Sequence, residues 1–363
     1  MRLLDRYLLR ELLTPLAYCL SGFLIFYVAF DLIFRISQFQ DAHLQAFDVV
    51  KYYVVTLPGI LADLVIPVSL LLALLYALTN HGRHNELVAM RAAGVGVWRI
   101  AAPYLAVGAA LGVVVLFINE VWAPQTADRA RELLQGHKGP ARERMAIRFR
   151  SDDTMRDWVV DGGIDPATGD LLQPQVRWTA PQPGAPQRIH ADRAAYHDGQ
   201  WIFSNADVWM WGKDQSTISS NYPMRLPETP AWIRTEIKLT SLSRTEAAKR
   251  PQLSIGELST YLRLHPNLGA DKRAIFQTQL QGRIAGPFTC LAVVMIAFPL
   301  GAKPGRRNVF VGVANSIFIC FAYFILQRVC FAFGTSGDMP PALAAWLPNL
   351  LCVGAGLALM THL

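Results

Sequence analysis

The stretch Ile100–Val121, IAAPYLAVGAALGVVVLFINEV, decides the fold of this chain. It carries no charged residue before Glu120, and a helix of about 20 apolar residues is enough to cross a bilayer. Directly behind it the sequence turns polar and strand-rich, from about Gln125 to Ile275, before it becomes apolar again. We therefore expect a membrane protein with one sizeable water-soluble domain on one side of the bilayer.

Five more apolar segments, two before this stretch and three after the polar block, are also long enough to be transmembrane helices. They are Leu12–Phe34, Tyr52–Leu78 (interrupted by Pro58 and Pro67), Ile284–Leu300, Val309–Phe333 and Ala342–Met360. The predicted fold is an α-helical membrane protein with six transmembrane helices, three on each side of an inserted all-β domain of the jelly-roll, sandwich or open-barrel type. The expected boundaries are residues 1–124, 125–275 and 276–363.

The composition supports a membrane protein. Hydrophobic residues make up 52% of the 363 residues and charged residues 17%, whereas a soluble domain carries about 25% charge. The net charge of +7 could point to nucleic acid, but the basic residues flank the apolar segments or scatter over the middle block. We therefore expect no nucleic-acid partner.

Basic residues in the short loops predict the orientation in the membrane. Arginine and lysine in such loops mark the cytoplasmic side, and here they cluster before the first segment, between the second and third, and between the fourth and fifth. These residues are Arg2, Arg6, Arg10, Arg83, Arg91, Arg99, Lys303, Arg306 and Arg307. Both termini are therefore expected on the cytoplasmic side of the membrane, and the β domain on the opposite side.

Alternating apolar residues and turn signals fill the middle block. Strands are predicted at Met145–Phe149, Trp158–Val160, Val176–Trp178, Arg188–Ala191, Trp201–Phe203, Val208–Trp211 and Ile233–Leu239. A turn is expected at His197-Asp198-Gly199. Helices are predicted behind the strands at Ser254–Arg263, where Ser254 and Glu257 form a capping-box pattern, and at Lys272–Gln281. The tryptophans of this block are expected to form its core or, alternatively, to line a groove for lipid chains.

The sequence shows no enzyme chemistry. It contains no G-x-x-x-x-G-K-[ST] loop for ATP phosphates, no G-x-S-x-G and no H-E-x-x-H. His81 and His84 have the spacing of one helical face but no third ligand nearby, so no metal site is expected. We predict that the chain is not an enzyme and needs no cofactor, and that a separate partner performs any ATP hydrolysis.

One cytoplasmic loop carries the most specific signal. Between the second and third apolar segments, the run Asn85–Gly94, NELVAMRAAG, predicts a short helix that its asparagine caps and its glycine ends. Leu87, Met90 and Arg91 share one face of this helix by three-and-four spacing. A short helix of this kind is what an ABC permease presents to a separate ATPase, although any amphipathic cytoplasmic turn would have a similar pattern.

Several short motifs make the sequence similar to the LptF/LptG family, the permeases of lipopolysaccharide export. They are Leu4-Asp5-Arg6-Tyr7, Leu57-Pro58, Ile66-Pro67, Asn85–Gly94, Trp122-Ala123-Pro124-Gln125, Met339-Pro340-Pro341 and Trp346-Leu347-Pro348. The resemblance covers both membrane halves, and in the β domain it rests on architecture and on the pattern of Ala191–Trp201. The Asp-Arg-Tyr start and the Trp-Ala-Pro-Gln motif resemble LptG more than LptF.

The resemblance implies a complete transport machine. This chain would be a permease subunit that extracts lipopolysaccharide from the outer leaflet of the inner membrane and passes it to a periplasmic bridge. It would pair with an LptF-like permease, be driven by an LptB-like ATPase dimer, and hand its lipid to LptC- and LptA-like proteins. The ATPase-coupling residues would be Glu86, Leu87, Met90 and Arg91, with Glu86 as the acidic contact.

Three arginines are candidates for binding the phosphates of such a lipid. Arg35 ends the first apolar segment at its outer face, and Arg129 and Arg131 follow the third. Arginine binds phosphate through a two-pronged fork. The alternative is that each arginine only anchors its helix at the membrane surface or is solvated.

Two ionisable residues lie within the apolar segments. Asp63 is inside the second segment, and Arg328 is in the outer part of the fifth. An intramembrane carboxylate marks a functional site by default, so an ion pair between these two residues is predicted, with a purely structural role as the alternative. Gly108 and Gly112 form a small-x-x-x-small pattern in the third segment, which predicts close helix packing.

Three other functions fit parts of the sequence. A secondary transporter driven by an ion gradient would use Asp63, but we find no convincing internal repeat. A membrane-anchored scaffold that binds a periplasmic protein would use the β domain, but it leaves the Glu86 helix unexplained. A lipoprotein-releasing or macrolide-type ABC permease would use that helix, but such subunits typically have fewer spans. Co-purification of an ATPase is the observation that best separates these functions.

Overall fold

The computed structural model describes residues 3–41, 44–122, 147–151, 155–165, 168–181, 185–213, 215–243, 253–266, 268–302 and 309–361. The chain divides into two compact units. We call Met1–His137, Gln252–Leu258 and Ala270–Leu363 the membrane unit, and Lys138–Pro251 with Ser259–Gly269 the β unit. The second unit is inserted into the first, as expected for a β domain placed between two helical halves.

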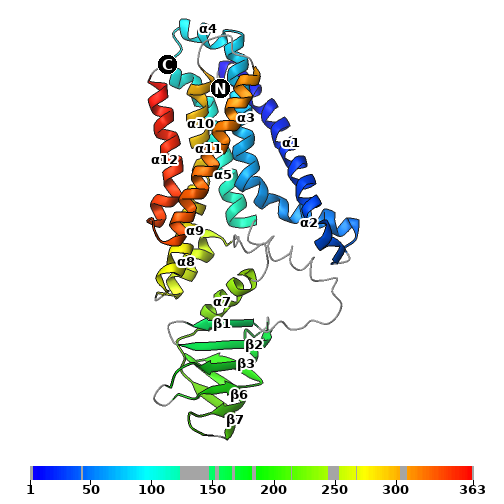
Figure 1. The fold of residues 1–363 in the computed structure, drawn as a ribbon, viewed down its shortest axis with the longest axis vertical. Helices are drawn as coiled ribbons and strands as arrows, with labels where there is room; N and C mark the ends of the chain where they lie inside the picture. Colours follow the sequence, from blue (N-terminus) through cyan, green and yellow to red (C-terminus); the bar gives the residue numbers. More distant parts are fainter. Residues whose placement is uncertain are drawn as a thin grey trace. The chain divides into compact units, whose positions relative to one another are not determined.

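The regular elements of the membrane unit are all helices within its described residues (Figure 1). Its elements are α1 (Leu3–Asp41), α2 (Ala46–Ile60), the π-helical segment η1 (Leu61–Val65), α3 (Ile66–Arg83), α4 (Glu86–Ala92), α5 (Val97–Phe117), the π-helical segment η2 (Ile118–Trp122), α9 (Ala270–Ala285), α10 (Phe288–Gly301), α11 (Val309–Ser336) and α12 (Pro341–Met360). Figure 1 places α4 at the same end of this unit as the start of α1 and the end of α12.

Several of these helices are long and apolar enough to cross a membrane. They are Leu3–Ser37, Val97–Trp122, Ile317–Ser336 and Pro341–Met360. The consecutive helices α9 and α10 are bent by 58° against each other and together make a fifth candidate span. The helical membrane architecture with an inserted β domain is thus confirmed, and the count of six spans is consistent with the described residues without being confirmed.

The second apolar segment is divided between Pro58 and Pro67. Pro58 lies inside α2 and Pro67 in the first turn of α3, and the π-helical turn η1 lies between them. Proline donates no backbone hydrogen bond and its ring crowds the preceding turn, and a π-turn absorbs such an irregularity without ending the helical run. The run α2–η1–α3 is not among the candidate spans.

The glycine pair of α5 lies against the bend between α9 and α10. A Cβ atom on Gly112 would lie 2.6 Å from the carbonyl oxygen of Pro287, and one on Gly108 would lie 2.9 Å from Cγ2 of Val294. Only glycine therefore allows α5 to approach the bend this closely. This contact confirms that the small-x-x-x-small pattern packs helices inside the chain.

The main core of the membrane unit is built mainly from residues of α1, α3, α5 and α10. Leu8, Leu12 and Leu16, spaced by four residues on α1, are buried against a stripe of leucines on α3. Further along, α1 exposes large apolar side chains such as Phe26 and Phe30. An exposed apolar face is expected where a helix meets lipid or another membrane helix.

The β unit is built on one antiparallel sheet. Its strands are β1 (Ile147–Ser151), β2 (Arg156–Ile164), β3 (Leu171–Trp178), β4 (Arg188–His190), β5 (Arg193–His197), β6 (Gln200–Trp209) and β7 (Ser216–Met224). They are ordered β1-β2-β3-β4-β6-β5, with β7 paired to β6 and a further pairing between β3 and β5. The predicted all-β class is confirmed. The predicted strands Trp201–Phe203 and Val208–Trp211 both fall on one strand, β6, and neither β5 nor β7 was predicted. The sequence of β7, STISSNYPM, is mostly polar.

One predicted strand of this block is wrong. Ile233–Leu239 lies in α7 (Pro230–Ser243), not in a strand. Thr229 starts this helix, because its side-chain oxygen accepts a hydrogen bond from Trp232 N at 3.3 Å and its carbonyl oxygen accepts one from Ile233 N at 3.0 Å. Pro230 then occupies the first helical position, where a missing N–H costs nothing. This start signal outweighs the alternating pattern.

Two further local predictions, a turn and a helix start, are confirmed. The turn between β5 and β6 is Asp198-Gly199, with φ of 51° and 79°, which is the conformation of a two-residue hairpin loop. Helix α8 (Ile255–Leu264) begins with the predicted capping box, in which Glu257 N donates to Ser254 Oγ at 3.1 Å and Ser254 N donates to Glu257 Oε2 at 3.0 Å. Of the tryptophans that were expected in the core, Trp158, Trp178 and Trp201 are fully buried there.

Candidate functional site

Helix α4 has well-defined ends. Asn85 lies in the left-handed region with φ of 58°, which asparagine tolerates better than most residues. Its side chain makes no capping hydrogen bond, so the prediction that Asn85 caps this helix is wrong. At the other end, Gly94 has φ of 81° and donates to Arg91 O at 2.9 Å, while Val95 donates to Met90 O at 3.1 Å. These two bonds are the Schellman arrangement that ends a helix at glycine.

The structure separates the residues that were expected to share one face of α4. Leu87 is 5% exposed and belongs to the main core, and Met90 packs against the same core. Arg91 is exposed, as are Val88 and Ala89. Leu87 and Met90 therefore hold α4 on the membrane unit, and the outward surface is formed by Val88, Ala89 and Arg91.

Glu86, the first residue of α4, is bound from two other helices. One carboxylate oxygen, Oε2, accepts a hydrogen bond from the Tyr7 hydroxyl of α1 at 2.9 Å and lies 2.7 Å from Nδ1 of His81 on α3. Because a carboxylate only accepts hydrogen bonds, Nδ1 of His81 carries the proton. The rings of Tyr7 and His81 are 5.7 Å apart. Glu86 thus joins α1, α3 and α4 at one point.

This environment changes the acidity of Glu86. Partial burial raises the pKa of its carboxyl, but the hydrogen bonds from His81 and Tyr7 and the positive potential of His81 and His84 more than offset that, so the pKa is lowered from its ordinary value. The side chain is still 31% exposed. Glu86 is therefore an anion that remains accessible to a partner.

A second polar contact joins the start of α5, which follows the α4 loop, to α1. Nη2 of Arg99, in the first turn of α5, lies 2.8 Å and 2.9 Å from the two carboxylate oxygens of Asp5 in α1. The loop that carries α4 is therefore held to α1 both at its start, by Tyr7 and Glu86, and just after its end, by Asp5 and Arg99.

Arg35 lies near the opposite end of α1. Its Nε donates to Asp31 Oδ1 at 2.9 Å, and the hydroxyl of Tyr53 in α2 donates to the other oxygen of Asp31 at 3.1 Å. The Arg35 side chain is 34% exposed. Phe39 and Tyr52 pack with Tyr53 in a small aromatic cluster at the same place. Within the described part of the chain, the hydrogen bond from Arg35 to Asp31 uses Nε and not the two Nη nitrogens.

The remaining candidate residues are described only in part. Arg129 and Arg131 lie outside the described residues, and so does the side chain of Asp63, whose backbone belongs to η1. Arg328 is exposed on α11. The pair of Asp63 with Arg328 therefore stays a prediction.

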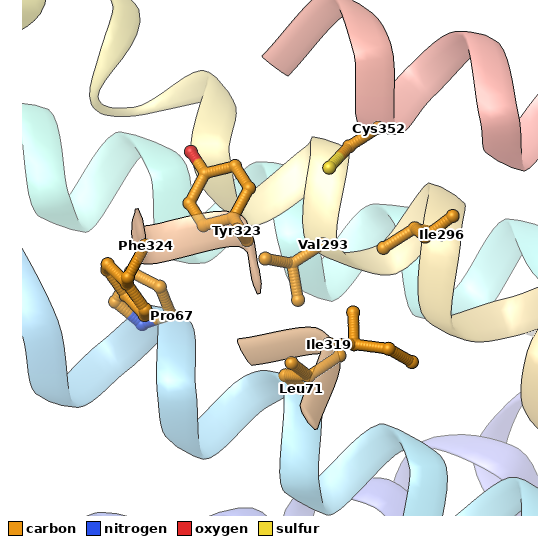
Figure 2. Close-up of a pocket in the computed structure, with 8 residues that line it drawn as sticks. All are labelled: Pro67, Leu71, Val293, Ile296, Ile319, Tyr323, Phe324 and Cys352. Carbon is orange, nitrogen blue, oxygen red and sulfur yellow. The ribbon is translucent and has the colours of Figure 1, made fainter. Parts of the chain in front are cut away.

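Metal and small-molecule sites find no support in the described residues. No cluster of three metal-ligating side chains occurs among them; the Nδ1 atoms of His81 and His84 contact Glu86 and Asn80 O. A small pocket between α3, α10, α11 and α12 is lined by Pro67, Leu71, Val293, Ile296, Ile319, Tyr323, Phe324 and Cys352 (Figure 2). Its most polar group, the Tyr323 hydroxyl, already bonds Asn349 Oδ1 at 2.7 Å, so nothing in the pocket would orient a polar ligand.

Sequence reasoning missed the partners of these residues. Tyr7 belongs to a quoted motif, and His81 precedes Glu86 by five positions, but neither was assigned a role. Asp31 stands four residues before Arg35, a spacing that predicts a contact on a helix, and could have been found in this way. Tyr53 could not, because only the packing of α2 against α1 brings it to Asp31.

The chain is similar to a known family of membrane proteins. A family model described as "Lipopolysaccharide export system permease LptF/LptG" matches residues 6–362, nearly the whole chain. No curated protein matches the chain. The description covers both subunit types, so the closer resemblance to LptG stays a prediction.

Proposed function

This chain belongs to the LptF/LptG family of lipopolysaccharide export permeases, and on that premise we propose how it is driven and how it holds its lipid. It is a multi-pass inner-membrane permease component and not an enzyme. In our proposal, an LptB-like ATPase dimer supplies the energy and an LptF-like permease completes the lipid cavity. The chain extracts lipopolysaccharide from the outer leaflet of the inner membrane and passes it to LptC- and LptA-like bridge proteins.

The observation that carries this proposal is the way α4 is mounted. Leu87 and Met90 fasten it to the membrane core, and Tyr7 and His81 hold its first residue. A helix attached this firmly moves together with the transmembrane helices around it, because packed interiors are stiff. Val88, Ala89 and Arg91 on its outward side, with the accessible carboxylate of Glu86, are the surface that we assign to the ATPase.

The site for the lipid headgroup is assigned to Arg35. Its Nε is held by Asp31, so its guanidinium is oriented before the lipid arrives. The two Nη nitrogens of an arginine suit a pair of phosphate oxygens. Arg129 and Arg131 are proposed as further phosphate contacts on their sequence position alone. The exposed apolar side chains of α1, such as Phe26 and Phe30, would meet acyl chains or the partner permease.

The β unit and the orientation complete the proposal. Both termini are placed in the cytoplasm, which agrees with their lying at the same end of the membrane unit as α4 (Figure 1). The β unit is placed in the periplasm, where its antiparallel sheet would receive the lipid and pass it to the bridge.

The test is a reconstitution. The chain is co-expressed with the other export subunits, purified, and placed in liposomes that contain lipopolysaccharide, and release of lipid to a periplasmic acceptor is measured with ATP. Release that needs ATP and that stops when the ATPase loses its phosphate-binding lysine supports the proposal. Release driven by a proton or sodium gradient without the ATPase would instead establish a secondary transporter.

A further inference from the structure

We propose that Tyr7 is a positioning residue that ties the start of α1 to the start of α4, so that a displacement of α4 is carried directly into α1. The inference rests on the proposed function, since α4 is taken as the helix that meets the ATPase. It deepens that function by naming the contact through which a displacement of α4 reaches the transmembrane helix α1.

The contact between Tyr7 and Glu86 is suited to such a role. It joins residues 79 positions apart through a 2.9 Å hydrogen bond from a hydroxyl to an ionised carboxylate, and charge-assisted hydrogen bonds are the stronger kind. Glu86 accepts a second bond from His81, a side chain only 1% exposed. The carboxylate therefore cannot swing away from Tyr7 without also leaving a buried histidine donor unsatisfied.

The start of α1 cannot easily turn within this site. Leu8, next to Tyr7, is fully buried in the main core. Asp5 precedes Tyr7 by two positions and lies about 200° from it around the helix, and Asp5 is bound by Arg99 of α5. The first turns of α1 are thus held from both sides of the loop. A sideways or rotational movement of α4 must take α1 with it or break these bonds.

The far end of the same helix carries the proposed lipid site. α1 is continuous from Leu3 to Asp41, past Pro15, and a helix rises 1.5 Å per residue, so Tyr7 and Arg35 are about 42 Å apart along it. One helix therefore connects the carboxylate on the ATPase side with the guanidinium on the lipid side. Through Tyr7, α1 delivers the movement of α4 to the place where the phosphate is held.

The experiment uses Tyr7→Phe, which removes only the hydroxyl and keeps the ring beside His81. The matched control is Tyr18→Phe, on the same helix but with an exposed side chain. A spin label at Val88→Cys, on the exposed side of α4, reports the mobility of this helix in the purified chain without any ATPase. The assembled complex in liposomes then gives the amount of complex, the KM for ATP, and the lipopolysaccharide released per ATP hydrolysed.

We expect Tyr7→Phe to increase the mobility of the label and to lower the lipid released per ATP by roughly threefold, the value of one net hydrogen bond at a partly exposed site. Assembly and the KM for ATP should be unchanged, and Tyr18→Phe should behave as wild type. In a Glu86→Gln background the effect of Tyr7→Phe should be much smaller, because Tyr7 acts through that carboxylate.

The outcomes that would overturn the inference are distinct. Unchanged label mobility in Tyr7→Phe means that the hydroxyl does not hold α4. Greater mobility with an unchanged ratio of lipid to ATP means that the contact is only structural, as does an equal loss of complex and of both activities. If the wild-type complex releases no lipid with ATP, the proposed function fails and the coupling role falls with it, while the label still shows whether Tyr7 holds α4.

Discussion

Arg35 and Asp31 lie one turn apart on α1 and are joined by a single 2.9 Å hydrogen bond through Nε. Because the carboxylate of Asp31 holds only Nε, it can fix the orientation of the guanidinium while both Nη nitrogens stay available to bind a phosphate. The pair therefore allows both a structural anchor and a phosphate site, and the two possibilities respond differently to substitution.

Arg35→Glu is expected to weaken lipopolysaccharide retention more than Arg35→Ala, because it adds repulsion to the loss of a bond. A hydrogen bond to a charged group is worth about 1.5–3 kcal/mol. Since the side chain is partly exposed, we expect the lower end for Arg35→Ala, about tenfold in affinity. Photo-crosslinking or co-purification measures the retained lipid. Equal losses for phosphorylated and dephosphorylated lipid would show that Arg35 is only a membrane-surface anchor.

Asp31→Asn should reduce retention by a smaller factor than Arg35→Ala, roughly threefold for one weakened hydrogen bond. The substitution keeps the shape but removes the negative charge that orients the guanidinium. Asp48→Asn in α2 is the control, since that carboxylate caps the helix start at Gln45 N instead. Retention that rises in Asp31→Asn would mean that Asp31 competes with the lipid for Arg35 and does not orient it.

Gly112→Ala is expected to destabilise the membrane unit by about 1–3 kcal/mol, the usual cost of overpacking. The added methyl would lie 2.6 Å from the carbonyl oxygen of Pro287, a backbone atom that cannot rotate away. Thermal unfolding in detergent measures the effect. Gly354→Ala on α12 is the matched control, because its Cβ would meet nothing within 4 Å; equal unfolding temperatures for the two variants would show that α5 does not approach the bend.

Acid should release the link between α1 and α4. The folded pKa of Glu86 is lowered, so its stabilising contribution is complete above the unfolded carboxyl pKa of about 4.3. The contribution is lost as the pH falls through the lower folded value. Wild type and Glu86→Gln, unfolded thermally between pH 7 and pH 3, should therefore differ most near neutrality and converge in acid. A difference that stays constant over this range would contradict the assignment.

Cysteine labelling decides the orientation. Ile218→Cys on β7 should react with a membrane-impermeant thiol reagent in intact spheroplasts, whereas Val88→Cys on α4 should react only after lysis, since both side chains are exposed in the structure. The wild-type chain is the background control, because its cysteines all lie in the apolar segments. The reverse labelling pattern would place the β unit in the cytoplasm and overturn the proposed topology.

The sequence by itself determined the elements whose signal is local. Long apolar runs, a polar block with alternating residues, the Gly94 stop of α4 and the Ser254–Glu257 capping box are all short-range patterns, and each is found in the structure. The same locality explains the errors. The alternating pattern at Ile233–Leu239 predicts a strand, although the start signal at Thr229 and Pro230 makes it a helix. A polar strand such as β7 carries too few apolar residues to be recognised.

Only the tertiary structure decided which residues meet. Glu86 was singled out from the sequence, but its partner Tyr7 is 79 residues away, and no local pattern reports a contact between two helices. The contact of Tyr53 with Asp31 also joins two helices and has no local signal. The place of Leu87 on α4 was predicted, but the packing of the helices buries its side chain in the core. A helix periodicity defines which residues share a face, while the packing of neighbouring helices decides whether that face is buried or presented to a partner.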